Sequence, residues 1–338
     1  MTAVWPKRFL VVIFLPTVAA HAVDANAIES TPLNQEPMMN MALPAEVFIT
    51  EVGPRDGLQM EKQVLPTADK ANLIAGLTAA GLKAIQVAAF VHPQKVPTMA
   101  DAEALIGQLS MTDGVDYSAL TLNRRGVERA CRTPIPWIEV SLSASEQQSL
   151  QNTGMTVDKA QAEIRAMVAT ARGAGRRVRG SIQCTFGCVD ACEIDTPQVV
   201  ELAALLLECG VDLLVLADTT GMATPITVRR ILQSVLPLAA QVPVGLHLHD
   251  TRGLGLVNVM AGLEMGIVHF DTSLGGLGGC PFVSGAAGNI ATEDTLHLMH
   301  SLNIATGVDA GLVAAQSREL SRFFGRALAG KMYRLLQP

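Results

Sequence analysis

The chain has 338 residues, of which 49% are hydrophobic and 17% are charged, and its formal net charge at pH 7 is -6. This balance suits a large buried core and argues against an intrinsically disordered chain. Because basic residues are not in excess, a nucleic-acid partner is not expected, although a local basic pocket for a phosphorylated cofactor stays open. Six cysteines are too few for a disulfide scaffold and are typical of a reducing compartment.

The first 45 residues differ in character from the rest of the chain. Two basic residues precede an apolar run at 9–15, and small residues at 20–22 resemble a cleavage site, which together form the pattern of a secretory signal. The run is too short to span a bilayer as a helix. The alternative is an extension from an upstream start codon, because Met38, Met39 and Met41 lie just before Val47, where regular patterning begins. We favour this alternative. We therefore separate residues 1–45 from a single predicted domain at 46–338.

From Val47 onward, short β-rich runs alternate with longer helical patterns. The predicted strands lie at residues 47–51, 84–90, 117–122, 137–142, 178–184, 213–217, 242–248 and 268–274. Helix starts are predicted at Thr156, Thr196 and Thr224, the last two followed by proline, and helix ends at Gly81, Gly210 and Gly266.

Eight alternating units predict an α/β fold with a parallel sheet, and their number favours a single closed (β/α)8 TIM barrel with a few extra C-terminal helices. An open, doubly wound sheet is the alternative. The glycine-rich phosphate turn expected after its first strand is missing, because residues 51–56 read EVGPRD instead.

Polar side chains follow four of the predicted strands at the point where each strand ends. In a barrel of this kind the carboxyl ends of the strands share one rim, and catalytic groups gather there. The residues that we expect at this rim are Glu51, Arg55, Asp56, Gln59, Asp218, His247, His249, Cys280 and Asn289.

A metal site is predicted among these residues. His247 and His249 are two apart on an expected strand, so their side chains share one face, and the alternative is a hydrogen-bonded structural pair. With Asp56 and Asn289 they form a shell of two imidazoles and two oxygens. Such ligands suit Mg²⁺ or Mn²⁺ in a site with open positions, and Zn²⁺ or Co²⁺ also fit.

Two further rim residues have candidate chemical roles. Arg55 can stabilise a developing oxyanion, the alternative being a simple ion pair with Asp56. Cys280 follows four glycines in six residues, and a thiol on such a loop can transfer a proton, whereas a buried filler is the alternative. Cys184, Cys188 and Cys192 contain no Cys-x-x-Cys pair, so zinc is not expected there.

Three motifs in order resemble the hydroxymethylglutaryl-CoA lyase family of metal-dependent TIM-barrel lyases, which are related to the Claisen condensing enzymes. They are EVGPRDGLQ at 51–59, HLHDT at 247–251 and GGLGGCP at 275–281, and the resemblance runs from about 47 to at least 294. The loop with Cys280 favours the lyase branch over isopropylmalate synthase and its relatives.

The resemblance implies roles for individual residues. Asp56, His247, His249 and Asn289 match the metal ligands, Arg55 the residue that stabilises an enolate oxygen, and Cys280 the thiol that helps to protonate the product. Asp218 matches an active-site acid and Glu51 a supporting carboxylate. The substrate-binding residues that we expect are Gln59, Gln86 and Asn152. Ser145, Glu146 and Asn152 sit where the family also has recurrent polar residues, whose roles are supportive.

Two positions depart from the family pattern. Gln86 stands where the lyases typically have an active-site glutamate, and Ala89 where they typically have serine. Glutamine keeps the size and hydrogen-bonding reach of glutamate but loses its charge, which alters neighbouring pKa values and the acyl group accepted. The chemistry is therefore better supported by the sequence than the substrate is.

The implied activity is metal-dependent cleavage of a 3-hydroxyacyl-CoA to acetyl-CoA and a keto acid, acetoacetate in the reference case, as in leucine degradation and ketone body formation. Open alternatives are a lyase for citramalyl-CoA or an isohexenyl homologue, a condensing enzyme, and an exported or catalytically silent binding protein. Because CoA thioesters are intracellular, a cytoplasmic enzyme is expected, with an acyl-CoA substrate, no membrane partner and a homodimer as one assembly.

Overall fold

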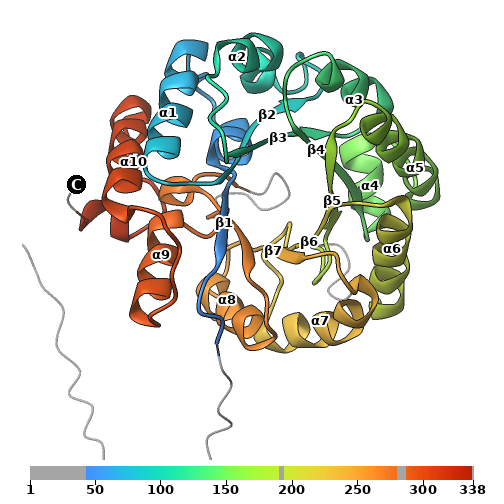
Figure 1. Ribbon diagram of the computed structural model, residues 1–338. Helices are drawn as coiled ribbons and strands as arrows, with labels where there is room; N and C mark the ends of the chain where they lie inside the picture. Colours follow the sequence, from blue (N-terminus) through green and yellow to red (C-terminus); the bar gives the residue numbers. More distant parts are fainter. Residues whose placement is uncertain (1–42, 190–193, 280–286, 337–338) are drawn as a thin grey trace, which may run out of the picture. The chain divides into compact units, whose positions relative to one another are not determined.

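A parallel barrel forms the body of the protein in the computed structural model, which describes residues 43–189, 194–279 and 287–336. The eight strands β1 to β8 pair in chain order, and β8 pairs with β1 to close the barrel. Helices surround the strands (Figure 1). The predicted (β/α)8 barrel is therefore confirmed, and the helices α9 and α10 follow the last strand as expected.

The strands are β1 (Phe48–Glu51), β2 (Ala84–Phe90), β3 (Asp116–Thr121), β4 (Trp137–Ser143), β5 (Arg177–Gln183), β6 (Leu213–Ala217), β7 (Val244–His247) and β8 (His269–Thr272). The α-helices are α1 (Thr67–Ala79), α2 (Ala102–Gln108), α3 (Arg124–Cys131), α4 (Glu146–Thr153), α5 (Val157–Gly173), α6 (Thr196–Cys209), α7 (Pro225–Ala239), α8 (Gly255–Glu264), α9 (Thr292–Ser301) and α10 (Ala310–Phe324). Short helical turns are η1 (Gly53–Gly57), η2 (Pro97–Met99), η3 (Leu274–Gly276) and η4 (Met332–Arg334).

Several predicted helix ends are confirmed by local hydrogen bonds. Thr224 caps α7 in a reciprocal capping box, and the Thr156 side chain accepts from the Lys159 N–H at the start of α5. Gly210 ends α6 with a φ of 83°, a left-handed conformation that glycine adopts without strain. The predicted cap at Thr196 was wrong by one residue, because α6 already includes Thr196 and its N-cap position is Asp195.

The seventh strand is shorter than predicted. It ends at His247, so His249 lies beyond it and forms an isolated antiparallel bridge with Asn289. The expectation that the two histidines lie on one strand was therefore wrong. The strand ends there because the chain turns to meet the segment that follows β8: the Ile290 N–H donates to the Leu248 carbonyl, and the Asp250 N–H to the Gly288 carbonyl.

A layer of charged side chains lies inside the barrel beneath the rim. Arg179 on β5 is 3% exposed and forms ion pairs with Glu139 on β4 and Asp271 on β8. Buried charges are tolerated only when they are paired, and this arginine has two carboxylate partners. The strands thus bury an electrostatic network between the apolar core and the rim.

No helix within the described residues is long and apolar enough to cross a membrane. The signal-like N-terminal segment up to residue 42, Cys192 and Cys280 lie outside the described residues.

Candidate active site

The turn after β1 carries two of the predicted site residues. The backbone carbonyl of Val52 accepts from three successive N–H groups, those of Arg55, Asp56 and Gly57. This hydrogen-bonding pattern forms the wide turn of a π-helix. Such turns are rare and occur frequently at functional sites. A Cβ at Gly53 would lie 2.2 Å from the Leu274 side chain and 2.6 Å from Glu51 Oε1, so a larger residue there would force these buried side chains to shift.

Glu51 braces this turn against the loop after β8. Its Oε1 accepts from the Gly53 N–H at 2.7 Å and the Leu274 N–H at 2.9 Å, and its Oε2 accepts from the Thr292 hydroxyl at 2.6 Å. Complete burial raises the pKa of Glu51 to about 8. The three hydrogen-bond donors lower this pKa, but burial has the larger effect. Glu51 thus supports the rim and does not line the cavity.

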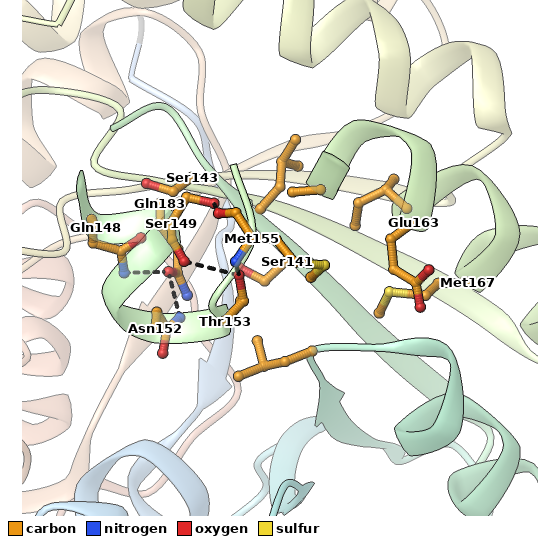
Figure 2. A pocket seen from close by; sticks show the side chains of 14 residues that line it. Ser141, Ser143, Gln148, Ser149, Asn152, Thr153, Met155, Glu163, Met167 and Gln183 are labelled. Atoms are coloured by element: carbon orange, nitrogen blue, oxygen red, sulfur yellow. Dashed lines mark hydrogen bonds between the residues drawn. The ribbon is translucent and has the colours of Figure 1, made fainter. Parts of the chain in front are cut away.

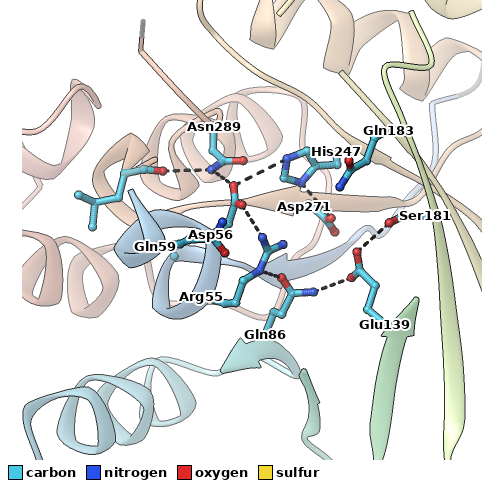
Figure 3. A network of polar contacts seen from close by, with 12 residues as sticks. Arg55, Asp56, Gln59, Gln86, Glu139, Ser181, Gln183, His247, Asp271 and Asn289 are labelled. Carbon is cyan, nitrogen blue, oxygen red and sulfur yellow. Dashed lines mark hydrogen bonds and ion pairs between the residues drawn. The ribbon is translucent and has the colours of Figure 1, made fainter. Parts of the chain in front are cut away.

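Asp56, which follows β1, and His247 and His249 at the end of β7 converge at the rim (Figure 3 shows Asp56 and His247). One ligand atom from each lies within 4.8 Å of the others. The two Nε2 atoms of the histidines are 3.2 Å apart, and Asp56 Oδ2 lies 4.0 Å from Nε2 of His247. Two ring nitrogens and a carboxylate oxygen around one point form a donor set for a divalent cation.

Asn289 completes this group from the loop after β8. Its Nδ2 donates to Asp56 Oδ2 at 2.7 Å, and its Oδ1 is buried without a hydrogen-bond partner in the described structure. An unpaired buried oxygen beside three ligand atoms fits a cation, because a buried polar atom without a partner is costly. Close backbone crossing positions this loop, since a Cβ at Gly288 would lie 2.4 Å from the Gly278 backbone.

The pKa values of these side chains suit metal binding. Burial alone would raise the pKa of Asp56, but Arg55 and the two histidines lower it to about 2. Burial lowers the pKa of His249 to about 3, so its ring is neutral. A coordinating aspartate must be ionised and a coordinating histidine must be neutral, and Asp56 and His249 meet these conditions.

The ring of His247 is oriented by a carboxylate behind it. Its Nδ1 lies 3.2 Å from Asp271 Oδ2, and its Nε2 therefore faces Asp56 and His249. Burial lowers the pKa of His247, but the hydrogen bond and charge of Asp271 outweigh burial and raise it. A carboxylate behind a ligating histidine is a common arrangement at metal sites.

Arg55 lies beside the candidate metal ligands with its guanidinium almost buried. Its Nη1 forms an ion pair with Asp56 Oδ1 at 2.5 Å, and its Nε donates to Gln86 Oε1. The ion pair with Asp56, which was the alternative interpretation, is therefore present. Because Arg55 also lines the cavity, the same guanidinium remains available to a developing oxyanion.

A cavity of about 440 Å³ opens over these residues. Gln59 and Asn152 line it, and the buried Oε1 of Gln59 has no hydrogen-bond partner among the described residues. Its apolar wall is formed by Val91, Leu120, Leu122, Val96 and Val215. A cavity with a candidate metal site at one end and an apolar wall suits a ligand with a polar reacting centre and an aliphatic body.

An amide cluster forms part of the wall of this cavity. Gln183 Oε1 accepts from Gln148 Nε2 at 2.7 Å and from Asn152 Nδ2 at 3.2 Å. Figure 2 shows these three residues in a second, smaller pocket that they also line. The other two polar residues of this region have local structural partners: Ser145 caps α4, and Glu146 accepts from the Val157 N–H. Of the three predicted polar residues here, only Asn152 reaches the cavity.

Asp218 lies just after β6, behind the cavity wall. Its Oδ1 accepts from the N–H groups of Met222 and Ala223, and its buried Oδ2 has no hydrogen-bond partner in the part of the chain that the structure describes. Burial raises the pKa of Asp218 to about 6, although the two N–H donors lower it. The neighbours Ala217 and Thr219 line the cavity and Asp218 does not.

Three charged residues near the site were not predicted from the sequence: Glu139, Arg179 and Asp271. The signal in the sequence that could have identified them is a charged residue within an otherwise apolar strand that is expected to be buried. Such a charge needs a buried partner, and the sequence does not say which strand supplies it.

Fold and site together define a class: a (β/α)8-barrel enzyme with a candidate divalent-metal centre at the carboxyl ends of its strands. The sequence profile of the HMGL-like family matches residues 46–319. The chain therefore belongs to the HMGL-like family, that of the hydroxymethylglutaryl-CoA lyases, and it is a carbon–carbon lyase.

Relatives and solved structures agree with this membership. The 3-hydroxy-3-isohexenylglutaryl-CoA/hydroxymethylglutaryl-CoA lyase of Pseudomonas aeruginosa is 38% identical over 85% of this chain and 96% of the relative. The hydroxymethylglutaryl-CoA lyase of Pseudomonas mevalonii is 39% identical over 83% and 93%. The crystal structure of the Bacillus subtilis HMG-CoA lyase superposes with a TM-score of 0.83 at 35% identity, covering 87% of this chain and 98% of that one. The HMG-CoA lyase of Acinetobacter baumannii, solved with coenzyme A and 3-methylmalate, gives a TM-score of 0.82 at 36% identity, covering 87% and 96%.

Proposed function

We propose that this protein cleaves 3-hydroxy-3-methylglutaryl-CoA to acetyl-CoA and acetoacetate, with Mg²⁺ or Mn²⁺ held by Asp56, His247, His249 and Asn289. The observation that carries the proposal is the convergence of these ligand atoms beside Arg55, which lines the same cavity as Asp56, His247 and His249. Relatives named hydroxymethylglutaryl-CoA lyase at 38–39% identity support it. The Acinetobacter baumannii relative solved with coenzyme A supports an acyl-CoA substrate.

A divalent cation in this site would act as a Lewis acid on the substrate oxygens and lower the pKa of the substrate hydroxyl. The ligand residues fit such a cation through their protonation states, because Asp56 is anionic and His249 is neutral.

Side chains of this protein would perform the proton and charge transfers. We assign the path of the hydroxyl proton to His247, which lines the cavity, or to Asp218, which lies behind the cavity wall and would receive the proton indirectly. As the bond between C2 and C3 of the acyl group breaks, its electron pair moves onto the thioester carbonyl and forms an enolate, whose oxygen the Arg55 guanidinium stabilises. Cys280, which lies outside the described residues, is proposed to deliver the proton that converts the enolate carbon to the methyl group of acetyl-CoA.

The decisive experiment incubates the purified full-length protein with Mn²⁺ and 3-hydroxy-3-methylglutaryl-CoA. Acetyl-CoA and acetoacetate should appear in equal amounts, and a chelator should abolish both. Release of neither product from a folded, Mn²⁺-loaded protein would reject this substrate.

A second substrate has a specific observation in its favour. Gln86 stands where a glutamate is typical of the lyases, and it is hydrogen-bonded to Arg55 and Glu139, which line the cavity (Figure 3). The Pseudomonas aeruginosa relative is named for a 3-hydroxy-3-isohexenylglutaryl-CoA activity as well. Values of kcat/KM for the methyl, isohexenyl and citramalyl substrates, each followed by acetyl-CoA release, will rank these acyl groups.

The substrate class also bears on where the protein acts. Acyl-CoA thioesters are intracellular metabolites, so we propose that the enzyme works in the cytoplasm. Immunodetection after fractionation of cells that express the native gene tests this, and a processed form outside the cytoplasm would contradict it.

A further inference from the structure

Gln86 bridges two strands of the barrel through its amide group. Gln86 lies on β2 and is fully buried. Its Nε2 donates to Glu139 Oε2 on β4 at 2.5 Å, and its Oε1 accepts from Arg55 Nε (Figure 3). The three side chains therefore form a continuous link from the turn after β1 to the fourth strand.

The orientation of this amide is fixed by its two partners. A guanidinium can only donate hydrogen bonds and a carboxylate can only accept them. Hence the Gln86 oxygen must face Arg55, and the Gln86 nitrogen must face Glu139. A reversed amide would lose both bonds inside a buried site, at the cost of unsatisfied polar groups.

Glu139 is itself held rigidly. Its Oε1 accepts from the Ser181 hydroxyl at 2.9 Å, and its Oε2 lies 2.8 Å from Arg179 Nε. It is 5% exposed, yet it lines the cavity over the candidate metal site. Two neighbours on β5 thus fix the carboxylate that orients Gln86.

We propose that Glu139 is a positioning residue: it orients the Gln86 amide, which in turn fixes the plane of the Arg55 guanidinium toward the enolate oxygen. This inference rests on the proposed role of Arg55. A carboxylate at position 86 would face Glu139 across the present 2.5 Å contact, where two like charges repel. Gln86 and Glu139 therefore form a matched pair, in which the charge on β4 requires a neutral amide on β2.

The test is a double-mutant cycle in the Mn²⁺-loaded full-length protein. Gln86→Glu should lower kcat on the order of 100-fold, because small displacements of a stabilising group are that costly. Glu139→Gln should lower kcat about 10-fold or more, because two facing amides no longer fix one orientation. The exchange variant Gln86→Glu/Glu139→Gln restores one carboxylate and one amide between the strands, so its kcat should exceed that of both single variants.

Control measurements separate positioning from general damage. KM and Mn²⁺ affinity should change less than threefold in all variants, because neither residue is a proposed metal ligand. Glu264→Gln, which breaks an outer pair with Arg229, serves as the matched loss of a carboxylate and should leave kcat unchanged.

Two results would overturn the proposal. One is a Glu139→Gln enzyme with the kcat of the wild type, and the other is an exchange variant no more active than the single variants. If the wild type cleaved no acyl-CoA, the proposed function would fail separately. The melting temperatures of the same four proteins would then decide whether Gln86 and Glu139 are matched, because only a matched pair makes the exchange variant more stable than Gln86→Glu.

Discussion

His247 and His249 face each other through their Nε2 atoms at 3.2 Å, although they do not share a strand. His247 is the last residue of β7, whereas His249 is held by its bridge to Asn289. Two neutral ring nitrogens at this distance repel unless one carries a proton or a cation lies between them. The pair is therefore suited to holding a cation between its two ring nitrogens.

Replacing any of Asp56, His247 or His249 by alanine should weaken Mn²⁺ binding by more than 100-fold, because each supplies a direct ligand in the proposed site and even residues behind the ligands matter about 10–100-fold. Isothermal titration calorimetry of the purified variants measures this. Asn123→Ala, which alters the wall of the same cavity, is the control. Unchanged Mn²⁺ affinity in all three variants would show that the metal does not bind at this site.

Arg55→Lys should reduce kcat by about 100–1,000-fold, the loss typical of removing one oxyanion donor. Lysine keeps the charge but cannot reach both Gln86 Oε1 and Asp56 Oδ1, as the guanidinium does. Steady-state kinetics measures the effect, with Arg229→Lys on the outer face as the control. A variant with full kcat would show that charge alone suffices.

Asp218 should govern the acidic limb of the pH–rate profile. A base acts only when deprotonated, and the pKa of Asp218 is about 6, so kcat should rise with pH through about 6 and then level off. Asp218→Asn should lower kcat about 100–10,000-fold and abolish the limb. If the limb persists in that variant, another group, such as His247, carries the proton.

Glu51 should make stability depend on pH. Its pKa in the folded protein is raised to about 8 from 4.5, so the folded state retains the proton more strongly than the unfolded state does. The stability contributed by Glu51 is fully present below pH 4.5 and is lost as pH rises through about 8. The melting temperature of the wild type relative to Glu51→Gln should therefore fall between pH 5 and pH 8, and an opposite trend would mean that Glu51 is ionised in the fold.

Glu51→Ala should destabilise the protein at every pH. It leaves the N–H groups of Gly53 and Leu274 without their acceptor in a buried position, at a cost of about 1–3 kcal/mol each. Urea unfolding measures this loss, and Glu51→Gln is its control because an amide oxygen can still accept from both.

Cys280→Ala should depress kcat while leaving Mn²⁺ affinity near that of the wild type, because the thiol is proposed to transfer a proton and not to bind the metal. Paired kinetic and calorimetric measurements separate the two effects, and Cys209→Ala on α6 is the control. Wild-type kcat would exclude Cys280 from the mechanism.

The sequence alone predicted the barrel, because alternating strand and helix patterns with capped ends are local properties of the chain. It also predicted the composition of the candidate metal site, because His247 ends a strand, His249, Asp56 and Asn289 follow strands, and the carboxyl ends of parallel strands share one rim. The family is confirmed independently by the match over residues 46–319.

Only the tertiary structure decided how these residues are held. Whether the charge of Glu139 is exposed, paired or joined to Gln86 depends on which strands close the barrel, and residues 53 positions apart in the chain carry no local signal of their contact. The same holds for Asp271 behind His247 and for Asn289 beside His249. Strand and helix patterns arise from neighbours in sequence, whereas the orientation of a buried polar group is set by partners that only the closed barrel brings within hydrogen-bonding distance.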